Sequence, residues 1–131
     1  MPLSWRIPWG LLIRRSSTGY LTQKEFSAVV AEFFGTPEES VRGWERAIDA
    51  QARIVTATTS ILREAPSDDD VAIVAHGGVG TLLLCHLTNL PISQDRDQPA
   101  TNGNYFAFDR PTLHLIHGCG YQAELSTVGL L

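Results

Sequence analysis

The sequence has few cysteines and few basic residues, and both shortages exclude kinds of protein. Its 131 residues include only two cysteines, Cys85 and Cys119, which are too few for the disulfide framework of a small secreted protein. Acidic residues outnumber basic ones by 14 to 10 and give a net charge of -4, whereas proteins that bind nucleic acid or anionic membranes carry basic patches. We therefore expect a cytoplasmic protein that binds neither nucleic acid nor membrane.

The sequence also lacks long apolar runs and paired metal-ligand motifs. No run is long enough to span a bilayer, and residues 1–15 fit neither a secretory signal nor a transit peptide. Cys85 and His86 form one group of possible ligands, and His114, His117 and Cys119 form another. Neither group has the C-x₂-C or H-x₃₋₅-H spacing of zinc sites, so we expect no metal and no cofactor.

What the sequence contains is enough apolar material for one core. Hydrophobic residues make up 44% of the chain and charged residues 18%, a balance typical of a folded single domain. Thr22 and Glu25 form a capping-box pattern before apolar residues at helical spacing, which predicts a helix ending near Gly35. A longer amphipathic helix is expected over residues 40–63. Two strands are expected at 104–109 and 113–117.

The most informative run covers residues 71–87. Residues 71–75 are continuously apolar, which is typical of a buried strand in a parallel sheet, and His76, Gly77 and Gly78 follow before a helix expected from about Val79 to 89. Glycines can adopt backbone angles closed to other residues and admit a ligand to the main chain, while a helix N-terminus offers unpaired N–H groups and a positive dipole end. Because ligands bind at the carboxyl ends of strands in open α/β sheets, the run predicts an anion site beside His76. The alternative is a core histidine, hydrogen-bonded to backbone, at an ordinary strand-to-helix turn.

These residues resemble a motif of the histidine phosphatase, or phosphoglycerate mutase-like, superfamily, in which a strand leads through His-Gly-Gly into a helix. The resemblance continues upstream over residues 15–26 and 37–54 and downstream over 97–109, and it covers about 15–117 in all. It implies an α/β fold, an incomplete three-layer α/β/α arrangement with a mostly parallel sheet. We expect a single truncated domain over 1–131, with an atypical segment at 1–14 and a poorly patterned tail at 118–131.

The resemblance also implies a metal-independent phosphatase or mutase that works through a phosphohistidine on phosphomonoesters. His76 corresponds to the family's second catalytic histidine and would donate a hydrogen bond to the transferring phosphoryl oxygens. The nucleophilic histidine of relatives lies in an Arg-His-Gly motif, which occurs nowhere in these 131 residues. The apolar residues before Arg15 faintly echo that strand, but a guanidinium stays protonated and cannot attack phosphorus. We therefore expect phosphomonoester binding with impaired catalysis.

The resemblance suggests further phosphate-binding residues, each with a simpler explanation. Gly77 and Gly78 would contribute main-chain contacts, and the loop at Asn102, Gly103 and Asn104 matches one that contacts phosphate in relatives, although these residue types also suit a turn.

Arg15 and Ser17 lie in a segment that is close to substrate in relatives, but a solvated basic loop is an equal alternative.

A different class of function is also open. The missing first strand would leave a sheet edge exposed, which suggests a non-catalytic interaction module or a homodimer. The remaining alternative is a fragment with no stable function.

Overall fold

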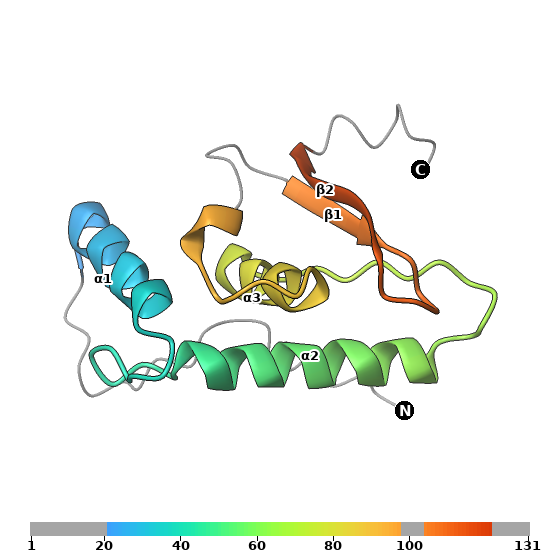
Figure 1. The fold of residues 1–131 in the computed structure, drawn as a ribbon, viewed down its shortest axis with the longest axis horizontal. Helices are drawn as coiled ribbons and strands as arrows, with labels where there is room; N and C mark the ends of the chain where they lie inside the picture. The colour runs from blue at the N-terminus through green and yellow to red at the C-terminus, as the bar shows by residue number, and fades with distance from the viewer. Residues whose placement is uncertain (1–20, 98–103, 122–131) are drawn as a thin grey trace.

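A computed structural model describes residues 21–97 and 104–121 as a mixture of helices and one small sheet (Figure 1). In Figure 1 the long helix α2 runs beneath α3, α1 lies at one end of α2, and the hairpin lies near the other end. The elements in chain order are α1 (Gln23–Gly35), α2 (Ala47–Glu64), α3 (Gly77–Leu87), the 3₁₀ turn η2 (Gln94–Arg96), β1 (Asn104–Phe108) and β2 (Leu115–Tyr121).

Helix α1 forms where its capping pattern predicts it. Thr22 Oγ1 accepts a hydrogen bond from the Glu25 N–H at 3.3 Å, and Glu25 Oε2 accepts one from the Thr22 N–H at 2.7 Å. This reciprocal pair satisfies two of the N–H groups that the start of a helix leaves without partners. The helix ends at Gly35, as predicted, and buries Val29, Phe33 and Phe34.

Helix α2 begins at Ala47, so the prediction of a start at Ser40 is wrong. Arg42 and Gly43 have φ values of 51° and 76°, in the left-handed region that interrupts a right-handed helix. Residues 40–46 therefore lie outside the helix, with a turn at Arg42 and Gly43. Val41 and Trp44 are nevertheless buried, so the apolar pattern correctly identified core residues although its first part is not helical.

The core lies between the three helices. Leu82 in α3 is 0% exposed, and the carbonyl of Leu82 accepts a hydrogen bond from Gln51 Nε2 of α2 at 2.9 Å. Residues 81–85 are all buried, and they form a largely apolar stretch of the kind that a helix covered by neighbours carries. The buried cluster comprises Val29, Phe33, Phe34, Val41, Trp44, Ala47, Ala50, Ile54, Val79, Leu82 and Leu83.

The prediction of a buried strand at residues 71–75 is wrong. The structure has no strand there, and the segment crosses as an irregular trace from the loop after α2 to the start of α3 (Figure 1). Val74 is 85% exposed. A strand requires a neighbour to accept and donate its ladder hydrogen bonds, and no strand in the described part of the chain pairs with this segment.

The two predicted strands are confirmed as an antiparallel hairpin. Asn104 pairs with Tyr121 and Phe108 with Leu115, with register irregularities between these ends. The second strand begins at Leu115 and continues to Tyr121, farther than the predicted end at 117. Within the described residues this two-stranded antiparallel sheet is the only sheet. The predicted, mostly parallel sheet is therefore not seen in that part of the chain.

The structure also bears on membranes and metals. Over residues 21–97 and 104–121, no helix combines the length and hydropathy needed to cross a bilayer. The same residues contain no cluster of three or more histidine, cysteine, aspartate or glutamate side chains arranged to hold a metal ion.

Candidate functional site

His76 occupies the N-cap of helix α3. Its backbone is extended, with φ -68° and ψ 149°, and its side chain makes no capping hydrogen bond. The residue is exposed, so the alternative of a core histidine is wrong. The imidazole is therefore open to a solute that approaches the start of α3.

The first turn of α3 presents backbone donors beside His76. The first intrahelical hydrogen bond runs from the Gly80 N–H to the His76 carbonyl at 3.0 Å, so the N–H groups of Gly77, Gly78 and Val79 come before the first intrahelical donor. This turn contains no acidic side chain. Backbone donors and the positive end of the helix dipole favour an anion at such a place.

Gly77 and Gly78 do not have the unusual backbone angles that the sequence suggested for them. Both belong to the first turn of α3, and Gly43 is the glycine with a positive φ within the described ranges. The two glycines therefore do not serve a left-handed turn. Both are half-buried, and the lack of a side chain leaves their backbone open to close approach.

Sequence reasoning missed Thr81, which supports this turn from inside. Its buried hydroxyl lies 3.0 Å from the Gly77 carbonyl and 2.9 Å from Asp97 Oδ1, so its single proton is shared between two acceptors. The contact ties the first turn of α3 to the chain that follows η2. The available signal was a hydroxyl residue within an otherwise apolar run.

The remaining predicted site residues are described only in part or not at all. Asn104 begins β1 and its backbone pairs with Tyr121. Arg15, Ser17, Asn102 and Gly103 lie outside the described residues. The structure thus brings together His76, Gly77 and Gly78 and leaves the other five as predictions.

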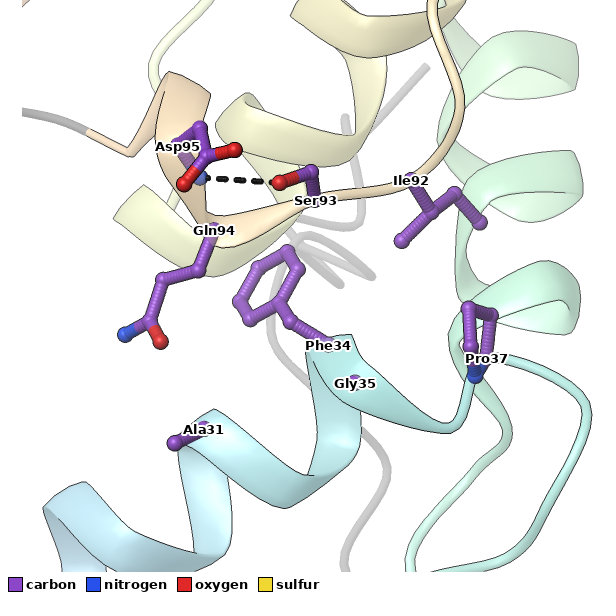
Figure 2. A pocket seen from close by; sticks show the side chains of 8 residues that line it. All are labelled: Ala31, Phe34, Gly35, Pro37, Ile92, Ser93, Gln94 and Asp95. Carbon is purple, nitrogen blue, oxygen red and sulfur yellow. Dashed lines mark hydrogen bonds between the residues drawn. The ribbon is translucent and has the colours of Figure 1, made fainter.

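A separate pocket lies between the end of α1 and η2 (Figure 2). It has a volume of about 320 Å³, and none of its lining residues is a predicted site residue. Ser93 Oγ accepts a hydrogen bond from the Asp95 N–H at 3.1 Å on one side of it. The lining residues are Ala31, Phe34, Gly35, Pro37, Ile92, Ser93, Gln94 and Asp95.

Several carboxyl groups have lowered pKa values, and all of these groups belong to caps and turns. Hydrogen bonds from the Thr22 backbone and hydroxyl lower the pKa of Glu25. A hydrogen bond from Arg46 lowers the pKa of Asp49, and hydrogen bonds from the Thr112 hydroxyl and N–H lower that of Asp109. These groups stabilise local structure and are not candidates for proton transfer at His76.

The comparison with protein families agrees with the motif at His76. The family model of the histidine phosphatase superfamily (branch 1) matches residues 18–111, which is most of the chain. The chain therefore belongs to the histidine phosphatase superfamily. No curated protein matches it.

Proposed function

We propose that this protein binds inorganic phosphate or phosphomonoesters at the start of α3, with His76 as the catalytic residue of the site. The observation that carries the proposal is the exposed His76 directly before N–H groups that precede the first intrahelical donor, in a turn without acidic side chains. Family membership supports the same ligand class. His76 would donate a hydrogen bond to a phosphoryl oxygen while the main chain of Gly77 and Gly78 holds another.

We expect the protein to turn over phosphomonoesters slowly or not at all by the family's metal-independent phosphohistidine chemistry. That reaction needs a nucleophilic histidine, and the chain has no Arg-His-Gly motif. Removing a covalent nucleophile typically costs several orders of magnitude in rate, because only electrostatic stabilisation is left. We therefore propose an impaired phosphatase or mutase in which binding is the surviving property.

The family resemblance extends this proposal to the rest of the site and fold. Arg15, Ser17, Asn102, Gly103 and Asn104 are proposed as additional phosphate-binding residues. The resemblance also implies a three-layer α/β/α arrangement with a mostly parallel sheet, and we propose that the protein acts in the cytoplasm.

Titration calorimetry with inorganic vanadate, a phosphate analogue, tests the proposal. His86 provides a matched control because it is also exposed and also lies in α3, but in the last turn. We expect the wild type and His86→Ala to bind vanadate and His76→Ala to bind it at least about tenfold more weakly, the loss expected for a charge-assisted hydrogen bond. Equal affinity in all three proteins would reject His76 as a site residue.

A turnover assay separates binding from catalysis. Purified metal-free protein should hydrolyse an aryl phosphate no faster than His76→Ala does. Vanadate-sensitive turnover that the substitution abolishes would instead require a nucleophile from another histidine or another chain.

A second candidate function is a non-catalytic interaction module that forms a homodimer. The 71–75 segment favours it, because an apolar, unpaired backbone with Val74 85% exposed is a template for pairing with another chain. Thermal denaturation at several protein concentrations distinguishes the two functions. Stabilisation by vanadate at every concentration supports a phosphate site, whereas stabilisation that follows protein concentration alone supports the dimer.

A further inference from the structure

Arg110 binds four backbone carbonyls in and after helix α2. Its Nη2 donates to the carbonyls of Leu62 at 2.6 Å and Ala65 at 2.7 Å. Its Nη1 donates to the carbonyls of Pro66 and, at 2.9 Å, Asp69. One guanidinium from the hairpin therefore holds the last turn of α2 and the loop that follows it.

The acceptors explain why the contact is strong. The last carbonyls of a helix have no intrahelical donor and carry the negative end of the dipole. Leu62 and Ala65 supply two such carbonyls, and Arg110 satisfies both from outside the helix. A lysine has a single ammonium in place of a planar fork with five donors, so it cannot reproduce the set.

The hairpin turn holds Arg110 in place. Asp109 Oδ2 accepts hydrogen bonds from the Thr112 N–H at 3.0 Å and the Thr112 hydroxyl at 2.6 Å. The Asp109 carbonyl also accepts one from the Leu113 N–H at 2.7 Å. These bonds close the turn around Arg110 and Pro111, and in Figure 1 the turn lies beside the end of α2.

The loop held by Arg110 leads directly to His76. After Asp70 the chain runs through the 71–75 segment, which lacks ladder hydrogen bonds and is largely exposed. Three of its five residues are exposed and two are half-buried, so the two ends contribute strongly to its position. One end is the buried helix α3, and the other is the loop fixed by Arg110.

We propose that Arg110 is a positioning residue for His76, acting through the 65–70 loop and the 71–75 segment. This inference rests on the proposed phosphate site at the start of α3. None of the hydrogen bonds of Arg110 described above goes to His76 or its glycines, so the residue acts on the site only through the backbone.

Backbone ¹⁵N relaxation tests the positioning without any ligand. In the wild type we expect order parameters of about 0.8 for residues 72–76, and in Arg110→Ala values below about 0.6. Millimolar guanidinium chloride, far below denaturing concentrations, should restore order in Arg110→Ala by filling the vacated place. Arg110→Lys should remain disordered.

Two controls separate positioning from general stability. Arg46→Ala removes an arginine at the opposite end of α2, and Val29→Ala destabilises the core from α1. Neither should change the order of residues 72–76. Disorder already present in the wild type, unchanged order in Arg110→Ala, or equal disorder in the controls would each overturn the inference.

Vanadate affinity supplies the functional measurement. Arg110→Ala should bind vanadate about ten- to a hundredfold more weakly, as misplaced site residues do, and guanidinium should restore part of the affinity. Unchanged affinity in Arg110→Ala would overturn the inference while leaving the phosphate site intact. A wild type that binds no vanadate would reject the proposed function, and the relaxation data would still decide whether Arg110 orders the segment.

Discussion

Two apolar runs lie close together in the sequence and have opposite environments. Leu82 in α3 is 0% exposed, whereas Val74 in the 71–75 segment is 85% exposed. Helix α3 satisfies its own backbone hydrogen bonds and packs against α2. A strand cannot satisfy its backbone alone, and the 71–75 segment pairs with no strand that the structure describes. Apolar composition therefore sets only the tendency to be buried, and the neighbouring element decides the outcome.

Replacing one residue in each run gives the largest expected contrast. Leu82→Ala should lower the free energy of unfolding by about 2–5 kcal/mol, because it removes buried methyl groups and leaves a cavity. Val74→Ala should change the same quantity by less than about 0.5 kcal/mol, since its side chain is exposed. Urea denaturation measures both. A comparable loss in the two variants would show that another element covers Val74 in solution.

A smaller contrast is expected between two ion pairs at the start of α2. Arg53 Nη2 lies 2.9 Å from Glu45 Oε2, with both side chains largely buried, whereas the Arg46–Asp49 pair is about half exposed. Glu45→Gln should cost about 1.5–3 kcal/mol, because it weakens a charged hydrogen bond away from water. Asp49→Asn should cost much less, because solvent screens the exposed pair. Equal costs in urea denaturation would contradict this ranking.

The capping box of α1 should give a still smaller effect. Thr22→Ala should destabilise the protein by about 1 kcal/mol, because it removes an N-cap acceptor. The Thr22 N–H and, to a smaller extent, the Thr22 hydroxyl lower the pKa of Glu25 from its usual 4.5, and the substitution removes the hydroxyl contribution. NMR titration should therefore find a higher Glu25 pKa in the variant. An unchanged pKa would show that the Thr22 hydroxyl does not bind this carboxylate in solution.

The Asp109–Thr112 contact in the hairpin turn predicts a pH-dependent difference in stability between the wild type and Thr112→Val. Hydrogen bonds from Thr112 lower the pKa of Asp109 below its usual 3.8, so the ionised carboxylate is favoured in the folded state. The resulting stability is present above the unfolded pKa and is lost as pH falls through the lower, folded pKa. Thr112→Val should therefore be less stable than the wild type at neutral pH, and the difference should shrink below about pH 3.8. A constant difference in denaturation between pH 2 and 6 would argue against the ionic contact.

Local signals in the sequence predicted α1 and the hairpin. The Thr22–Glu25 capping box involves residues three apart, so the pattern contains the whole interaction. The start of α2 was missed because apolar spacing continues through Val41 and Trp44 while positive φ angles at Arg42 and Gly43 break the helix. The sequence therefore predicted that Val41 and Trp44 are buried, but it did not predict that the backbone around them is non-helical.

Long-range contacts explain what the sequence did not reveal. The Arg110 guanidinium reaches carbonyls more than 40 residues earlier in the chain, and no spacing rule links such positions. The 71–75 segment was expected to be a strand, but strand formation depends on a partner that its own residues do not specify. The His-Gly-Gly motif did predict the place of His76 at the start of a helix, because that signal is contained in consecutive residues.

The most direct test of the phosphate site is an NMR titration with inorganic phosphate that follows the backbone amides of Gly77, Gly78 and Val79. These N–H groups precede the first intrahelical donor, Gly80. Saturable shifts of these amides that weaken in His76→Ala, with no comparable shifts elsewhere, are the predicted result. Unchanged amides at saturating phosphate, in a protein whose helices remain folded, would contradict the proposed function.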